Sequence, residues 1–278
     1  MITLSIDTSA ASAVAWLQGD KAETTLSMQV TGDARHHVET LSETISATKT
    51  RGGLDAQERA DLIVVGRGPA PFTGLRAGIM TALTLGAAWQ VPVVGVCSLD
   101  ALALQVLRDL EGKGAAGQAL QADEVTVIFS DARRQEVYYR AYRTEGRGDL
   151  RGVLGPFVGS AKEAIETLAE AGLRRCACAG RGVELYDDAL REAAQDFGME
   201  LRFVQEEDGL RVPNPALAGR LAWEHIRGAV GDVAADANAE DLLAHVASLS
   251  PKEMEAAGLH TTPDYLRRPD IHMGKPKT

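Results

Sequence analysis

Aromatic side chains and positive charge are both scarce in this sequence. Only 5% of the 278 residues are aromatic, which argues against a surface that stacks the bases of single-stranded nucleic acid. The net charge of −10 argues against a protein that binds polyanions on its own. One basic cluster stands out, and we interpret it as a solvated hairpin in preference to an RNA-binding patch: Arg133, Arg134, Arg140, Arg143 and Arg147.

Cysteine and long apolar runs are also rare. The three cysteines are Cys97, Cys176 and Cys178, and no second cysteine or histidine pair stands at the spacing of zinc ligands. We expect these thiols to be small buried apolar groups, and their odd number fits a reducing compartment. No run approaches about 18 apolar residues and the first ten residues carry no basic segment, so we expect a cytoplasmic protein without membrane contact.

The order of predicted strands and helices indicates two α/β lobes. Residues 2–7, 12–17 and 22–30 have the pattern of strands, a helix follows from about residue 33, and two short apolar strands come later. Residues 111–123 are rich in glycine, alanine, glutamine and charge, as expected of a connection. We assign 1–110 to an N-terminal, partner-binding lobe and 111–278 to a C-terminal lobe with a tail and an acidic surface extension over about 231–250.

The end of the first predicted strand carries three short polar side chains, Asp7, Thr8 and Ser9. A carboxylate and two hydroxyls at such a position can hold phosphate oxygens and a magnesium ion. The same residue types are common in β-turns, and the sequence alone favours this second interpretation. The three residues are our candidates for the vicinity of a nucleotide or phosphate.

A loop rich in glycine and proline joins a short strand to an apolar helix. Glycine allows unusual backbone conformations and proline stiffens the loop. An arginine in the first turn of the helix opposes the helix dipole, so we expect it to have an anionic partner. The loop lacks the Lys-Ser/Thr of a Walker A motif, which leaves a phosphate cradle and a structural turn as the two interpretations. The candidate residues are Gly66, Arg67, Gly68, Pro69, Phe72, Thr73, Gly74 and Arg76.

Two predicted helices carry faces suited to another helix. The helix after the loop has three small residues spaced four apart, which form a groove for close approach. An earlier helix has a narrow apolar stripe on a polar surface. We predict that both faces form a partner interface, made of Val38, Leu41, Ile45, Gly78, Ala82 and Gly86.

Patterns for catalysis and metal binding are missing. The sequence has no G-x-S-x-G nucleophile motif, and its six histidines form no pair at metal-ligand spacing on one helix face. We therefore predict no catalytic residues and no metal site.

Five segments resemble the TsaB (YeaZ) family, which is related to the TsaD/Gcp glycoprotease-like family. They are LSIDTSAASAVAWL at 4–17, VGRGPAPFTGLRAGIMTALTLG at 65–86, VPVVGVCSLDALA at 91–103, DARRQEVYYRAY at 131–142 and PDYLRRPD at 263–270. The usual family loop is G-R-G-P-G-S-F-T-G-L-R, and this chain has Ala70 and Pro71 in place of its Gly-Ser. The resemblance implies a two-lobed α/β fold like that of actin, sugar kinases and the Hsp70 ATPase, with a mixed sheet and helices in each lobe.

The resemblance also implies that this chain is not itself an enzyme. The catalytic relative TsaD begins with I-E-T-S-C-D-E-T and carries two metal-binding histidines in N-H-L-E-G-H. Here Ala11 and Ser12 stand where the second acidic pair would be. Ser98 and Leu102 occupy the places of the two histidines, and neither side chain can replace an imidazole.

The function implied is that of a non-catalytic scaffold in the transfer of threonylcarbamoyl to the adenosine 3′ of the tRNA anticodon, acting by pairing with TsaD. The alternative is a nucleotide-dependent phosphotransferase or ATPase of the same fold. A third interpretation, a homodimeric binding module, is compatible with the first, because the same face can pair with itself when the chain is alone. We expect contact with tRNA only through the complex and no cofactor in isolation. The resemblance leaves open a TsaE-like ATPase as a further partner and ATP or ADP at the subunit interface. We expect Ala82→Arg to give a folded protein that no longer pairs with TsaD.

Overall fold

The computed structural model describes residues 1–31, 37–112, 120, 123–145, 149–204, 211–230 and 237–266. Its first sheet has five strands, β1 (Ile2–Asp7), β2 (Ala13–Gln18), β3 (Thr24–Val30), β4 (Leu62–Gly66) and β5 (Val93–Val96), in the order β3-β2-β1-β4-β5. Strand β2 is antiparallel to β1 and β3, whereas β4 is parallel to β1 and β5.

The second sheet repeats this topology. It contains β6 (Val125–Asp131), β7 (Glu136–Glu145), β8 (Asp149–Ser160), β9 (Arg175–Ala179) and β10 (Glu200–Phe203), in the order β10-β9-β6-β7-β8. As in the first sheet, the first three strands in the chain, β6, β7 and β8, pair antiparallel. Strand β9 is parallel to β6 and to β10. This duplication confirms the predicted two-lobed α/β fold with a mixed sheet in each lobe.

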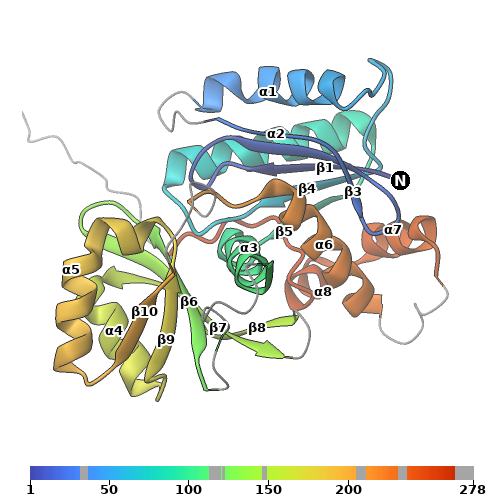
Figure 1. Ribbon diagram of the computed structural model, residues 1–278. Coiled ribbons are helices and arrows are strands. Elements are labelled where there is room, and N and C mark those ends of the chain that lie inside the picture. Colours follow the sequence, from blue (N-terminus) through green and yellow to red (C-terminus); the bar gives the residue numbers. More distant parts are fainter. Residues whose placement is uncertain are drawn as a thin grey trace, which may run out of the picture.

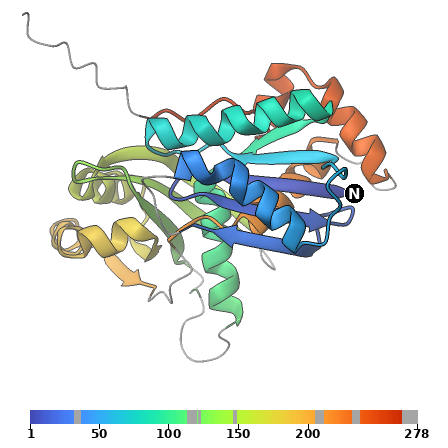
Figure 2. The ribbon, with the colours of Figure 1, turned by 90° about the horizontal axis from the view of Figure 1, so that it is seen from above.

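Helices enclose both faces of the first sheet. Helices α1 (His37–Arg51) and α2 (Phe72–Trp89) lie side by side over one face, and α6 (Pro215–Val230) and α7 (Ala239–Ser248) cover the other (Figures 1 and 2). Helix α3 (Ser98–Gly112) lies between the lobes, while α4 (Ala161–Glu170) and α5 (Arg181–Asp196) pack on the second sheet.

Strand β4 illustrates why this lobe forms three layers. Ile63 and Val65 pack in the cluster under α1 and α2, whereas Leu62 and Val64 pack in the cluster under α6 and α7. A short strand that is apolar at every position is typical of a parallel strand buried on both faces. The sequence of β4 therefore requires a helical layer on each side.

The C-terminal segment differs from the predicted domain division. Helices α6, α7 and the short α8 (Pro251–Ala256) lie far beyond residue 111, yet they pack on the first lobe (Figure 1). Trp223 is 1% exposed and its indole N–H donates to Thr3 Oγ1 at 3.0 Å. The chain thus returns to the first sheet, and residues 111–278 do not form one lobe.

The predicted acidic extension is also a packing element. Its described part forms α7, in which Leu242 is fully buried against the core of the first lobe. Two of the acidic residues that suggested a surface extension, Glu240 and Asp241, occupy the first turn of this helix, where they favour the helix dipole. Residues 231–236 lie outside the described residues.

The apolar stripe of α1 faces the protein's own core. Leu41 and Ile45 are 1% and 8% exposed, and they pack with Ala82 of α2, which is 0% exposed, between the two helices and the first sheet. Their predicted place in a partner interface is therefore wrong. The side chain of Val38 lies outside the described residues.

The small-residue groove of α2 also faces inward. A Cβ atom at Gly78 would lie 2.3 Å from Thr8 Oγ1, and one at Gly86 would lie 2.2 Å from Val93 Cγ2. The groove allows close approach, as predicted, but what approaches is the sheet of the same lobe. The predicted interface role of Gly78, Ala82 and Gly86 is wrong for this reason.

The outer face of α2 presents a different set of residues. Arg76, Met80, Leu83 and Ala87 are exposed at helical spacing, and Met80 and Leu83 are 60% and 38% exposed. Large apolar side chains exposed together on one helix are typical of a contact surface. We call these four residues the outer face of α2.

The two faces of α2 predict opposite outcomes for neighbouring arginine substitutions. The sequence-based expectation of a folded Ala82→Arg protein is wrong, because Ala82 is 0% exposed. The substitution places an unpaired charge in the core and should destabilise the protein by on the order of 4 kcal/mol, a large part of the total stability. Leu83→Arg places the same charge in solvent and should leave the fold intact. Circular dichroism and urea unfolding of both variants test this. A stable Ala82→Arg protein would contradict the inward orientation.

Candidate functional site

The candidate residues meet at one edge of the first sheet. Strands β1, β4 and β5 are parallel, so their carboxyl ends lie at the same edge. Asp7 ends β1, Gly66 ends β4, and Ser98 begins α3 just after β5. The fold thereby brings together the Asp7–Ser9 turn and the glycine loop, which lie about 60 residues apart in the sequence.

The Asp7 carboxylate is fully buried and hydrogen-bonded on both oxygens. Its Oδ1 accepts from the Ser9 backbone N–H at 2.8 Å and from Ser9 Oγ at 2.6 Å, and its Oδ2 accepts from Ser98 Oγ at 2.7 Å. Burial raises the pKa of Asp7, because desolvation penalises the charged form, and the hydrogen bonds from Ser9 and Ser98 partly offset this.

Ser98 also closes the glycine loop. The Gly68 N–H donates to Ser98 Oγ at 3.2 Å, and the Ser98 N–H donates to the Gly68 carbonyl at 2.8 Å. Gly68 has a φ of +94°, a conformation that a residue with a side chain rarely adopts. One serine therefore connects the end of β1, the loop and the start of α3.

The remaining space between loop and turn is filled. A Cβ atom at Gly66 would lie 1.9 Å from Asp7 Oδ2, and Thr8 Oγ1 donates to the Gly74 carbonyl at 2.8 Å. Thr8 is 2% exposed. Asp7, Thr8 and the loop thus pack directly on one another, which is the geometry of a structural turn.

A C-terminal segment, residues 259–266, lies across β5 and the glycine loop, and we call it the strap. The Gly95 N–H donates to the Leu259 carbonyl at 2.8 Å, the Asp264 N–H donates to the Arg67 carbonyl at 2.9 Å, and the Arg67 guanidinium pairs with the Asp264 carboxylate. No role was predicted for the strap residues from the sequence. Their signal was the PDYLRRPD segment, of which 267–270 lie outside the described residues.

Arg76, at the start of α2, has aromatic neighbours. Its guanidinium lies 3.9 Å from the centre of the Phe72 ring, and its Nε donates to Tyr265 Oη of the strap at 3.0 Å. The Phe72 and Tyr265 rings are in contact, with centroids 4.6 Å apart and planes tilted by 33°. The expected anionic partner is thus replaced by aromatic faces and a phenol oxygen, which also stabilise a cation.

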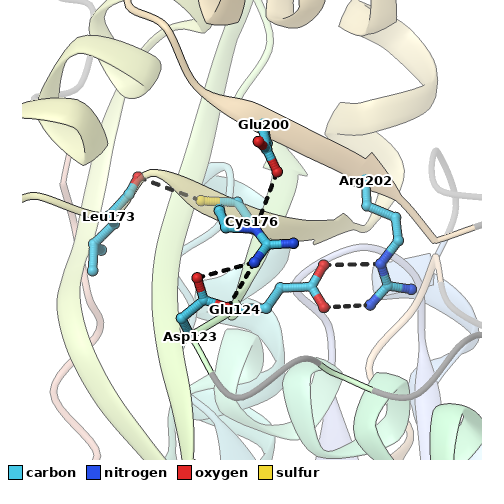
Figure 3. Close-up of polar contacts among 7 residues, drawn as sticks. Asp123, Glu124, Leu173, Cys176, Glu200 and Arg202 are labelled. Carbon is cyan, nitrogen blue, oxygen red and sulfur yellow. Dashed lines mark hydrogen bonds and ion pairs between the residues drawn. The ribbon is translucent and has the colours of Figure 1, made fainter.

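Cys176 and Cys178 lie on β9 of the second sheet, whereas Cys97 directly precedes Ser98 at this site. All three are buried and free, and burial raises the pKa values of Cys97 and Cys176 to about 12, so these thiols are unreactive. Figure 3 shows Cys176 on β9 near the ion pair of Glu124 and Arg202, whose two contacts are 2.8 Å each. The prediction of small buried apolar groups is confirmed.

Within the part of the chain that the structure describes, no three His, Cys, Asp or Glu residues gather as a metal site. Ser98 and Leu102, at the places where the metal-binding relative has histidines, are 1% and 2% exposed in the interior. No described helix is long and apolar enough to cross a membrane.

The arginine cluster is divided by the fold. Arg133 lies in the β6–β7 turn and pairs with Asp131 at 3.4 Å, whereas Arg140 points inward and pairs with Asp100 at 2.9 Å. Arg143 is exposed, and Arg147 lies outside the described residues. The part of the cluster in the turn agrees with the hairpin interpretation, but Arg140 belongs to the interior between the lobes.

Comparisons with known proteins relate the chain to one family. Residues 29–267 match the family model described as TsaD, tRNA N6-adenosine threonylcarbamoyltransferase. An uncharacterized protein of Mycobacterium leprae is 38% identical over 161 residues, which cover 57% of this chain and 39% of that protein. The chain thus spans less than half the length of that relative.

Two further matches have descriptive names. The tRNA threonylcarbamoyladenosine biosynthesis protein TsaB of Haemophilus influenzae is 29% identical over 177 residues, which cover 60% of this chain and 67% of that protein. The structure of YeaZ from Pseudomonas aeruginosa has a TM-score of 0.58 at 25% identity and covers 87% of this chain and 97% of that one. Both confirm the resemblance to the TsaB (YeaZ) family.

The buried carboxylate predicts a specific pH dependence. In the unfolded chain Asp7 loses its proton near pH 3.9, whereas the folded state retains it to higher pH. The contribution of Asp7 to stability therefore falls as pH rises from about 3.9 through the raised pKa. Urea unfolding should show the stability of the unsubstituted protein, relative to Asp7→Asn, decreasing over this range.

Asp188→Asn is the matched control, because Asp188 is an exposed aspartate on α5. A difference between the unsubstituted protein and Asp7→Asn that stays constant or grows with pH would contradict the burial of the Asp7 carboxyl group.

Proposed function

Because this chain belongs to the family described as TsaD, tRNA N6-adenosine threonylcarbamoyltransferase, we propose that it acts in threonylcarbamoyladenosine modification of tRNA as a subunit without a catalytic centre of its own. The relative named TsaB, a biosynthesis protein of this modification, and the fold shared with YeaZ support this role. The chain would serve as the scaffold for a TsaD-like catalytic subunit.

The observation that carries the proposal is the closed state of the Asp7 turn. Phosphoryl transfer requires carboxylates that can reach a magnesium ion and phosphate oxygens. Both oxygens of Asp7 are occupied by Ser9 and Ser98 inside the protein, and the nearby Ala11 and Ser12 are 4% and 0% exposed. This favours the scaffold over the phosphotransferase or ATPase of the same fold.

The outer face of α2 is the surface that we assign to the catalytic subunit. Met80 and Leu83 offer apolar area, and Arg76 is held in place by Phe72 and Tyr265, so it needs little ordering when a partner binds. Two helices of the partner packed against α1 and α2 would form a four-helix bundle. These are the two helices that were assigned to the interface from the sequence. The face of α2 that we now assign to it is the outer one, opposite to the small-residue groove.

Several finer points belong to the same proposal. The isolated chain binds no cofactor and uses the same face to form a homodimer. In the complex, ATP or ADP lies at the subunit interface, tRNA is contacted through the complex, and a TsaE-like ATPase is an additional partner. The site of action is the cytoplasm.

The pairing is tested by co-expression with the TsaD homologue of the same organism. Leu83→Arg and Met80→Arg should each weaken the complex by about tenfold or more, because a charge replaces an apolar contact at its centre. Size-exclusion chromatography and calorimetry measure the loss. Leu185→Arg is the matched control, since Leu185 is 48% exposed on α5 of the other lobe. Full binding by folded Leu83→Arg and Met80→Arg proteins would place the interface elsewhere.

A further inference from the structure

A cavity of about 430 Å³ lies between the two lobes. Its walls come from α3, α6 and the end of α8 on one side and from β7 and β8 on the other. Helix α3 lies at the centre of these elements in Figure 1. Arg67 reaches the cavity from the glycine loop. The volume is that of a site for a small metabolite.

The charged groups in its wall are held in fixed positions. Asp100 Oδ1 accepts from Tyr142 Oη at 2.8 Å and pairs with Arg140 Nη1 at 2.9 Å. Arg67 pairs with Asp264 of the strap. Asp100 and Asp264 thus hold the guanidinium groups of Arg140 and Arg67 by a terminal nitrogen of each.

Three buried polar atoms in the wall have no hydrogen-bond partner in the described part of the chain. They are Arg67 Nε, Arg140 Nε and His225 Nδ1, and they make up half of the six such atoms found there. Buried polar groups are nearly always hydrogen-bonded, so such a concentration around one cavity requires an explanation. Both Nε–H groups can only donate, and what they lack is an acceptor.

Glycine residues lie beside two of these side chains, and Gly152 leaves room for one of them. A Cβ atom at Gly152 would lie 2.4 Å from Arg140 Nη2 and 2.8 Å from its Nε. A Cβ atom at Gly258 would be in ordinary contact with His225 Nδ1, at 3.6 Å, so it is the φ of +69° that favours glycine there. A side chain at position 152 would displace the Arg140 guanidinium.

We propose that this cavity binds a small metabolite through a phosphate or carboxylate group, with Arg67, Arg140 and His225 as the residues that recognise the oxyanion. An oxyanion supplies several acceptors in one group, which suits two donor-only Nε–H groups and matches the preference of guanidinium for phosphate and carboxylate. Leu104 and Leu221 provide apolar walls for the body of the ligand. This inference does not depend on the pairing with a catalytic subunit.

The histidine provides a direct readout. Burial lowers the pKa of His225, and Arg67 and Arg140 lower it further while Asp100 opposes them; Glu224 also lines the cavity. An oxyanion bound beside the imidazole stabilises its protonated form, so it should raise this pKa. Binding at a distant site would leave it unchanged.

The experiment titrates the full chain with inorganic phosphate, and separately with succinate, and follows the His225 ring signals by NMR across pH. We expect one of the two anions to bind until the cavity is saturated and to raise the pKa of His225 as it binds. The phosphate and succinate arms distinguish the two kinds of ligand group. If neither anion binds, or both leave His225 unaffected, water fills the cavity and the proposal is wrong.

Conservative variants separate recognition from folding. Arg140→Lys keeps the positive charge beside Asp100 but removes Nε. It should weaken the binding of whichever anion binds to the unsubstituted protein by about tenfold. Arg143→Lys, at an exposed position on the same strand, is the matched control and should bind as the unsubstituted protein does. If the Arg140→Lys protein is unstable, His225→Gln tests the same loss of anion affinity. Equal affinity in folded Arg140→Lys and His225→Gln proteins would overturn the assignment.

Discussion

The hydrogen bond from Ser98 to Asp7 is the contact on which the first lobe depends. A carboxylate without access to water is tolerated only when its oxygens are hydrogen-bonded, so Ser9 and Ser98 must hold their positions. Because Ser98 also bonds to Gly68 in both directions, the same requirement fixes the glycine loop and thereby the start of α2. The strap then covers the loop through Arg67 and Asp264.

This closed junction has consequences on two sides of the molecule. Towards solvent, it sets the orientation of α2, whose outer face we assign to a partner subunit. Towards the second lobe, it directs Arg67 into the cavity between the lobes while Asp264 holds the terminal nitrogen of the guanidinium. In this junction the end of β1 packs against the glycine loop and Ser98.

The sequence predicted the strands of the first sheet, the presence of two α/β lobes and the small-residue groove, because these follow from local periodicity and residue size. It could not show which surface fills the groove. Spacing alone does not distinguish a second subunit from Thr8 and Val93 of the same lobe. The return of α6 to the first sheet and the contact between Arg67 and Asp264, 197 residues apart, depend on long-range packing that no local pattern encodes. Residues of the cavity were missed for the same reason, since each lies on a different element.

The central claim is that the Asp7 turn is a closed structural junction that does not take up a nucleotide. The most direct measurement is the ¹³C signal of the Asp7 carboxyl group in the isolated chain during titration with magnesium and ATP. The account predicts that this signal stays unchanged, because both oxygens remain bonded to Ser9 and Ser98. A shift that saturates with magnesium and ATP would show that the junction opens to a nucleotide and would contradict the account.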